Sequence, residues 1–571
     1  MTVKIADIQN NDKSEEKQES GSRELLTSFV VVFLLSLFAL IVGMSLHPNA
    51  YDEGIVLTGS MRVAAGQVPH RDFYSIYGPA QFYILAVLFK FFGQTLLIER
   101  ALDLFYRALL VASVYVIAVS YVRRRIAVCA SAVTLVWLFA LYYYTVGAAT
   151  IPVSLLNLVS TGLVVQAFTH PVSRRRIFAV GVLSGLASLF RYDTGIALLW
   201  IHVCVIAIGV TVRLKEDRFS GFIAQCWPYL LGFGVVVLSP IVYYFSVAPV
   251  QPFIHDVIFF PSHYYHRARN LPFPTITLKS LDNFAIYLPI AILGVSLFAI
   301  VTNYLREKDN GASAYTKLQN QRGQGFLIAF SLLAMAMYLK GVVRVGVIQM
   351  YLATIPTILL TALLFEERSV FWRPVRRFIV MATCLTVLSP AWGSLREIRD
   401  MYVQHVSLPE HVWSTVRKTS PAIRATWCAT TSPLTRGLCF LPEDYRIQAI
   451  EFIQSHTRPD QTLFVGVTRH DKIVANDNLT YFATHRLPAT RWSHFDPDLQ
   501  TSAEIQKQIV SELEINLPPY IILDSEYDLQ QEPNDSSRSS GVTILDDYLH
   551  RKYHPLHSFG QMSIWQRTPA L

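Results

Sequence analysis

Charged residues are scarce in this chain of 571 residues: 16% are Asp, Glu, Lys or Arg, whereas 52% are hydrophobic. A soluble globular protein carries about 25% charged residues. The deficit is concentrated in apolar runs such as Leu25–Leu46, which contains no charged residue over a length sufficient to cross a bilayer. The composition therefore predicts a multi-pass membrane protein. It excludes a cytosolic enzyme, a secreted protein and a nucleic-acid-binding protein.

Several sequence signals are also absent. No small-residue cleavage pattern follows the first apolar run, so we expect that run to be retained as a span rather than removed as a signal peptide. Neither a G-x-x-x-x-G-K-[ST] loop nor a strand-linked G-x-G-x-x-G motif occurs, which argues against nucleotide-driven transport or catalysis. The broken helices and inverted repeats of many transporters are missing as well.

Eleven apolar runs are predicted to cross the membrane. They are Leu25–Leu46, Ala101–Val122, Ile126–Thr145, Thr150–Thr169, Ile177–Phe190, Gly195–Val212, Phe222–Val247, Asn283–Leu305, Gly325–Leu339, Val347–Phe365 and Phe378–Leu395. If these runs alternate in direction, five basic clusters fall on one side, and the positive-inside rule makes that side cytoplasmic. This topology places the N-terminus in the cytoplasm and the C-terminal domain in the periplasm or its equivalent.

A further apolar stretch, Pro79–Phe92, is short for a span and contains Lys90. If it crossed the bilayer, the basic cluster at Arg123 would face outward. We therefore interpret this stretch as a juxtamembrane or re-entrant helix.

Three regions follow from this pattern. Residues 1–24 form a polar N-terminal arm that is expected to be disordered, residues 25–395 form the membrane domain, and residues 396–571 form an outer α/β domain. A large first outer loop spans residues 47–100. In the outer domain, helices and strands are predicted to alternate as in a small parallel sheet, at Asp444–His456, Thr462–Val467, Ala503–Ile515 and Tyr520–Leu523.

The six cysteines fall into two groups. Cys428 and Cys439 lie in the outer domain, where an oxidising compartment would let them pair, but their spacing in the sequence does not decide whether a disulfide forms. The other four are predicted to be small buried hydrophobic residues within spans, at Cys129, Cys204, Cys226 and Cys384.

Polar motifs gather in the first outer loop. Asp52 and Glu53 follow the first span directly, and acids so close to hydrocarbon are costly and often functional, although they could also simply begin a helix. A G-x-x-P-x-x-D stretch follows at Gly66–Asp72, and then Gly78-Pro79 precedes Tyr83. Farther along, Phe92-Gly93 and Arg100 lie before the second span.

The order of these motifs resembles that of bacterial GT-C-type integral membrane glycosyltransferases, relatives of protein O-mannosyltransferases and of the lipid A aminoarabinose transferase. The resemblance continues at Gly185–Arg191, at Arg344, and at Asn476-Asp477-Asn478 with Tyr481. Relatives often carry R-x-D-x-x-H near the late span, but here Val345, Gly346 and Gln349 follow Arg344. Any role of that acid and histidine is therefore in doubt for this chain.

The resemblance implies a GT-C-like helical membrane domain that transfers a sugar, with inversion, from a polyprenyl-phosphate donor to an acceptor hydroxyl on the outer face. It also implies a bacterial inner membrane as the location. It makes Asp52 the candidate general base, with Glu53 as the neighbouring candidate. Basic residues would bind the donor phosphate, and Lys340, Arg344, Arg267 and Arg269 are suitably placed in outer loops. Further residues are expected to shape the substrate cavity: Asp72, Tyr74, Tyr77, Tyr83, His255, Asp256 and Tyr264.

Other interpretations of the same residues stay open. The basic and aromatic residues at 263–269 are also typical of side chains that anchor a protein at the membrane interface. Arg191–Asp193 suits an ion-paired outer turn with a structural role. The D-x-D sequence Asp496-Pro497-Asp498 is predicted to be a turn rather than a metal site, since Asp-Pro initiates turns and nucleotide sugars are scarce outside the cytoplasm.

The expected partners are the lipid-linked sugar, membrane lipids and a glycan, lipid or protein acceptor, with no nucleic acid. No metal-ligand spacing is recognisable, so a requirement for a divalent cation is left open. The main alternative function is a non-catalytic transporter, flippase or binding protein for lipid-linked saccharides.

Overall fold

The computed structural model describes most of the chain, namely residues 2–44, 48–169, 172–214, 216–275, 277, 283–309, 314–366, 373–405 and 444–569. Cys428 and Cys439 lie outside the described residues, and with them the question of whether they form a disulfide.

Each of the eleven predicted runs coincides over most of its described length with a helix. The helices are α1 (Thr2–Val42), α4 (Leu96–Val119), α5 (Arg124–Ala140), α7 (Thr150–Val164), α8 (Arg174–Phe190), α9 (Tyr192–Arg213), α10 (Arg218–Val247), α13 (Phe284–Asp309), α14 (Ala314–Val342), α15 (Tyr351–Glu366) and α16 (Arg373–His405). Among the described residues, eight helices are long and apolar enough to cross a membrane. The helices α5, α8 and α15 are shorter, with 17, 17 and 16 residues. The multi-pass architecture is thus confirmed.

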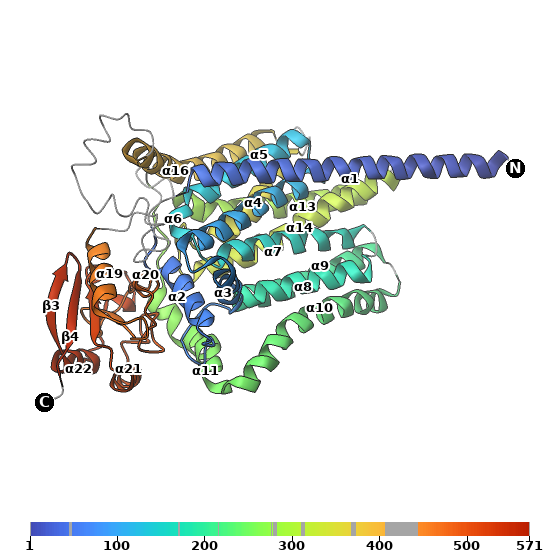
Figure 1. Ribbon diagram of the computed structural model, residues 1–571. Coiled ribbons are helices and arrows are strands. Elements are labelled where there is room, and N and C mark those ends of the chain that lie inside the picture. The colour runs from blue at the N-terminus through green and yellow to red at the C-terminus, as the bar shows by residue number, and fades with distance from the viewer. Residues whose placement is uncertain are drawn as a thin grey trace.

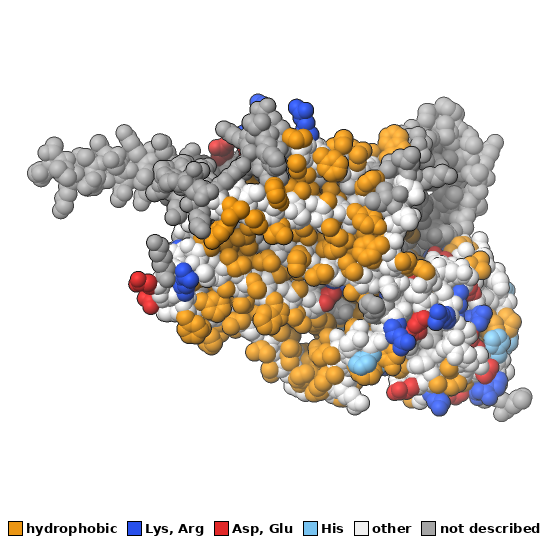
Figure 2. Space-filling view, turned by 180° about the vertical axis from the view of Figure 1, so that it is seen from behind, with side chains coloured by type: hydrophobic (Ala, Val, Ile, Leu, Met, Phe, Trp, Pro, Cys, Tyr) orange, Lys and Arg blue, Asp and Glu red, His pale blue; other side chains and the backbone are white. Residues whose placement is uncertain are grey.

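The long helices run side by side as one bundle (Figure 1). Figure 2 shows hydrophobic side chains over its flank, with charged side chains gathered over the C-terminal domain. Where α8 and α10 pack, a Cβ added at Gly181 would lie 2.1 Å from the carbonyl oxygen of Tyr229, so only glycine permits this approach. Two cysteines predicted to be buried, Cys129 and Cys204, are exposed on the bundle surface because they lie on outward helix faces.

The N-terminal arm differs from its prediction. Helix α1 begins at Thr2, so residues expected to be disordered continue the first span as one helix. Glu, Lys and Gln are frequent in this segment and have high helix propensity, which explains the continuation.

The C-terminal domain combines helices with a four-stranded sheet of order β1-β2-β4-β3. Its elements are α19 (Asp444–His456), β1 (Phe464–Val467), α20 (Leu479–Thr484), α21 (Ala503–Asn516), β2 (Tyr520–Asp524), α22 (Ile544–Lys552), β3 (Tyr553–Phe559) and β4 (Met562–Arg567). The predicted parallel pairing holds for β1 and β2, in the register Phe464↔Ile521. It is wrong for the sheet as a whole, because β4 pairs antiparallel with both β2 and β3. Most of β3 is exposed and it contains Pro555, so it lacks the apolar alternation that would identify a strand.

Two short helices of the first outer loop, α2 (Asp52–Ala64) and α3 (Ala80–Phe92), lie between the bundle and the C-terminal domain (Figure 1). They share a buried core with the C-terminal domain, in which Phe89 stacks on Phe482. The amides of Asn478 and Leu479 donate to the carbonyl of Ala50 at 2.9 and 3.1 Å. A Cβ on Gly54 would lie 2.5 Å from the Leu479 nitrogen. The start of α2 is therefore fixed against α20.

Candidate active site

An open cavity of about 580 Å³ lies where the outer loop, the helix bundle and the C-terminal domain meet. Four carboxyl and four basic side chains line it: Asp52, Asp193, Asp496, Glu532, Arg191, Arg269, Lys340 and Arg344. They come from α2, the start of α9, α12 (His266–Arg269), the end of α14 and two loops of the C-terminal domain. The fold thus collects charged groups from positions up to 480 residues apart in the chain.

Asp52 begins α2 on the wall of this cavity. The side-chain oxygen of Asn49 accepts hydrogen bonds from the amides of Tyr51 and Asp52 at 3.0 and 2.9 Å and so supports the helix start. The Tyr77 hydroxyl donates to Asp52 Oδ1 at 3.3 Å. Among the described residues Asp52 forms no ion pair. Burial raises the pKa of Asp52, an effect only partly offset by the hydrogen bond from Tyr77 and by the charge of Arg269.

The basic residues of the cavity each lie against a carboxylate. Arg344 donates two hydrogen bonds to the carboxylate of Glu532, from Nη1 to Oε2 at 3.0 Å and from Nη2 to Oε1 at 2.5 Å. Lys340 Nζ lies 3.5 Å from Asp193 Oδ2, which also pairs with Arg191 at 3.3 Å. These pairs hold positive charge at the cavity surface, where an anionic ligand could exchange places with the carboxylates.

Arg269 and Asp496 form the most buried pair in the cavity wall. Arg269 Nη2 donates to Asp496 Oδ1 at 3.0 Å and to the Tyr51 hydroxyl at 2.9 Å, while Tyr74 donates to Asp496 Oδ2 at 2.9 Å. Burial alone would raise the pKa of Asp496, but His494 and Arg269 together hold it below its usual value. Asp496 is therefore an ionised structural partner of Arg269.

Glu53, the second candidate base, does not line the cavity. Its side chain is fully buried, with Arg100 Nε 2.5 Å from Oε1 and Arg100 Nη2 2.8 Å from Oε2. The amide of Asn49 donates to Oε2 at 2.8 Å. These contacts leave Glu53 turned toward the bundle interior rather than toward substrate.

The other predicted residues divide by position. Tyr77 lines the cavity, and Tyr74 lies directly behind it. Asp72 lies outside the cavity and forms an ion pair with Arg71 at 2.7 Å. Asp256 is buried, and its carboxyl oxygens lie 3.2 Å from His70 and 3.2 Å from His255. Tyr83 lines a second, apolar cavity of about 490 Å³ between α3, α8 and α10. Arg267 and Tyr264 are exposed outside both cavities.

Comparisons with known proteins identify the fold. No protein-family model and no curated protein matches the sequence. The structure of ArnT from Cupriavidus metallidurans bound to undecaprenyl phosphate superposes with a TM-score of 0.51 at 12% identity, covering 95% of this chain and 98% of that one. This chain has the ArnT fold. The GT-C-like fold expected from the sequence motifs is thus confirmed.

Two other solved structures are also similar. ArnT from Cupriavidus metallidurans in the apo state gives a TM-score of 0.46 at 12% identity, with 96% of this chain and 100% of that chain covered. The oligosaccharyltransferase of Archaeoglobus fulgidus, in complex with Zn and sulfate, gives 0.47 at 10% identity, with 87% and 68% covered.

Sequence reasoning missed part of the cavity within this ArnT fold. The sequence predicts a turn at Asp496-Pro497-Asp498. A turn is present from Pro497 onward, but Asp496 itself precedes it and faces Arg269. Arg191 and Asp193 were given only a structural role, although both line the cavity. Nothing in the local sequence marks Glu532, which lies in a polar loop after β2.

The described residues include no group of three or more His, Cys, Asp or Glu side chains arranged to hold a metal ion. Three of the four cavity carboxylates are already bound to basic side chains. This donor set does not fit a protein-ligated divalent cation.

Proposed function

We propose that this protein transfers a sugar from a polyprenyl-phosphate donor to an acceptor hydroxyl, with inversion at the sugar and with Asp52 as the general base. The observation that carries the proposal is the composition of the cavity: within the described part of the chain Asp52 has no ion-pair partner, while Arg191, Lys340 and Arg344 lie on the same surface. The ArnT structure that shares the fold was solved with undecaprenyl phosphate, which supports a lipid-phosphate donor.

The proposed step is a single displacement. The acceptor oxygen attacks the anomeric carbon and its proton passes to Asp52, while the bond from that carbon to the phosphate oxygen breaks. The electron pair leaves with the lipid phosphate, whose charge the Arg and Lys side chains stabilise. Attack opposite the leaving group inverts the configuration. The raised pKa of Asp52 suits this role, because a carboxylate that binds a proton more tightly is a stronger base.

The two cavities suit the two halves of such a donor. Arg191 and Asp193 line the polar cavity, whereas Tyr192 between them lines the apolar one, so both cavities lie against the first turn of α9. The apolar cavity has tyrosine, phenylalanine, proline and aliphatic walls that fit a hydrocarbon chain. No step of the proposed reaction passes through a metal.

The test uses the full chain in membranes supplied with radiolabelled polyprenyl-phosphate sugars, with release of lipid phosphate and labelling of acceptors as readouts. We expect transfer by the wild type and a loss of about 10²–10⁴-fold in Asp52→Asn, with an unchanged unfolding temperature. Asp460→Asn, an exposed carboxylate of the C-terminal domain, is the matched control and should retain transfer.

Equal transfer by Asp52→Asn and wild type would reject Asp52 as the base. Saturable binding of the lipid-linked sugar without turnover of any donor would reject the proposal that the protein is an enzyme. It would favour a transporter or binding protein.

A further inference from the structure

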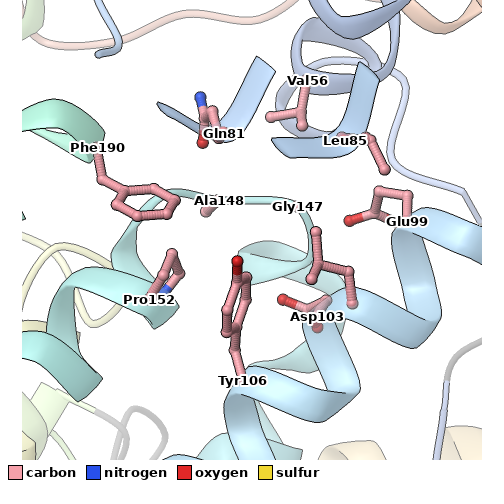
Figure 3. A pocket seen from close by; sticks show the side chains of 11 residues that line it. Val56, Gln81, Leu85, Glu99, Asp103, Tyr106, Gly147, Ala148, Pro152 and Phe190 are labelled. Carbon is pink, nitrogen blue, oxygen red and sulfur yellow. The ribbon is translucent and has the colours of Figure 1, made fainter. Parts of the chain in front are cut away.

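A small chamber lies inside the protein on the bundle side of α2 and has a volume of about 30 Å³. Four polar side chains point into it from α3 and α4, namely Gln81, Glu99, Asp103 and Tyr106 (Figure 3). We call it the Glu99 chamber. Ala148 lines both this chamber and the large cavity, so only a thin wall separates the two.

The Glu99 chamber contains hydrogen-bonding groups without protein partners. Gln81 is 6% exposed, and neither its amide nitrogen nor its amide oxygen forms a hydrogen bond. Glu99 is 3% exposed, and its Oε2 accepts none. Buried polar groups are normally satisfied, by water where protein does not reach. Because the Gln81 amide needs both a donor and an acceptor, and because 30 Å³ accommodates a water, a water molecule fits this space.

The charges around the chamber do not balance. Arg100 pairs with Glu53 at 2.5 Å, and Arg107 pairs with Asp103 at 2.6 Å. Glu99 is a third carboxyl group beside these two arginines. Arg100 Nε lies 3.7 Å from Glu99 Oε2 but only 2.5 Å from Glu53 Oε1. An ionised carboxylate without its own cation is strongly unfavourable in such a buried position.

The neighbouring elements supply no further cation to Glu99 among the described residues. Helix α3 contributes the neutral Gln81, and the ring of Tyr142 on α6 (Tyr142–Thr145) packs against Arg100. Helix α2 contributes Glu53, a second acid, whose carboxyl is already engaged by Arg100.

We infer that Glu99 holds a proton at neutral pH and, together with Gln81, binds a water molecule in the chamber. With Glu99 neutral, the charged groups beneath the first turn of α2 form two balanced pairs, Glu53–Arg100 and Asp103–Arg107. This inference does not rest on the proposed sugar transfer, since it concerns groups that do not line the large cavity.

Infrared spectroscopy of the full chain in lipid nanodiscs tests the inference at neutral pH. The wild-type spectrum minus that of Glu99→Gln should contain the C=O stretch of a protonated carboxyl, which shifts to lower frequency in D₂O. Asp103→Asn is the matched control and should keep the band, because Asp103 has its own ion-pair partner, Arg107. In Gln81→Leu the band should remain but move to higher frequency, because the carboxyl loses its water.

The remaining outcomes are decisive as well. If Glu99→Gln removes no carboxyl band, Glu99 is ionised and the inference is overturned. If the unfolding temperature of the wild type also rises with Na⁺ relative to choline, and this dependence disappears in Glu99→Gln, a cation occupies the chamber instead. If the carboxyl band of Gln81→Leu has the same frequency as that of the wild type, the inference that Glu99 and Gln81 bind a water molecule is overturned. The Gln81→Leu arm needs no Glu99 variant, so it stays informative if Glu99→Gln does not fold.

Discussion

Asp52 and Glu53 are neighbours in the sequence, yet they belong to two regions with opposite electrostatic character. Asp52 faces an open cavity and has a single hydrogen bond from Tyr77. Glu53 faces the bundle interior, where Arg100 contacts both of its oxygens. Successive residues on a helix point about 100° apart, so one turn of α2 can serve both regions.

The difference places the carboxylate proposed to react beside one that supports the helix. Glu53, paired with Arg100, fixes the start of α2, and Asp52, which has no ion pair among the described residues, is thereby held at the cavity surface. Changes on the Glu53 side should therefore act mainly on stability, and changes on the Asp52 side mainly on turnover.

The largest expected effect on stability is that of Glu53→Gln. The substitution keeps the shape of the side chain but removes the carboxylate charge that contacts the fully buried Arg100 at 2.5 and 2.8 Å, which should lower the free energy of unfolding by about 3–5 kcal/mol. Thermal unfolding in detergent measures the change. Asp460→Asn removes an exposed ion pair with Arg458 and should leave the unfolding temperature unaltered. Equal stability of Glu53→Gln and wild type would show that the pair does not support α2.

A medium effect is expected from Gly54→Ala. The new methyl group would lie 2.5 Å from the backbone nitrogen of Leu479, so α2 and α20 must separate, at a cost of about 1–3 kcal/mol. Gly294→Ala in α13 is the matched control, since a Cβ there meets no atom within 4 Å. If both variants unfold at the same temperature, the start of α2 is not held by the C-terminal domain.

The sequence predicts the membrane helices well because a bilayer requires long apolar runs, and such runs are a local property. It also predicts that Lys340 and Arg344 belong near Asp52, although only through the resemblance to a family. Adjacency of Asp52 and Glu53 does not reveal which one faces substrate. That choice depends on how α2 packs on α20, more than 400 residues later in the chain.

The C-terminal contribution to the cavity could not be predicted from local patterns. Asp496 and Glu532 lie in loops, and their positions depend on how the C-terminal domain packs against the bundle. Asp-Pro correctly indicates a turn at residues 497–500, but it carries no information about the partner of Asp496. The same limit applies to the strand β3, whose exposed residues give no apolar alternation.

A smaller effect, on ligand affinity, is expected from Glu532→Gln. The substitution removes the carboxylate charge that pairs with Arg344 in the cavity that Asp52 lines. Burial alone would raise the pKa of Glu532, but the hydrogen bonds from Arg344 and Asn534, together with the charge of Arg344, hold it below its usual value. A donor phosphate must displace this carboxylate to reach Arg344. Loss of the charge should tighten binding of undecaprenyl phosphate about 2–5-fold, as measured by competition with a labelled donor. Glu366→Gln, which breaks an ion pair with Arg123 outside the cavity, should not change the affinity. Weaker binding by Glu532→Gln would show that Glu532 contributes to the site rather than competing with the donor.

The smallest expected effect is a shift in pH dependence caused by Tyr77→Phe. The proposed reaction requires ionised Asp52, so its rate should rise with pH through the pKa of Asp52, which burial holds above the value of about 3.9 of an exposed aspartate. The Tyr77 hydroxyl donates to the ionised form and therefore lowers this pKa. Without it the pKa rises, and the acid limb of the rate profile should move to higher pH by about 0.5–1 unit. Tyr144→Phe removes a hydroxyl from the same cavity wall without touching Asp52, so its profile should match that of the wild type. If the acid limb does not move in Tyr77→Phe, a group other than Asp52 titrates in the reaction. The general base would then not be the carboxylate at the start of α2.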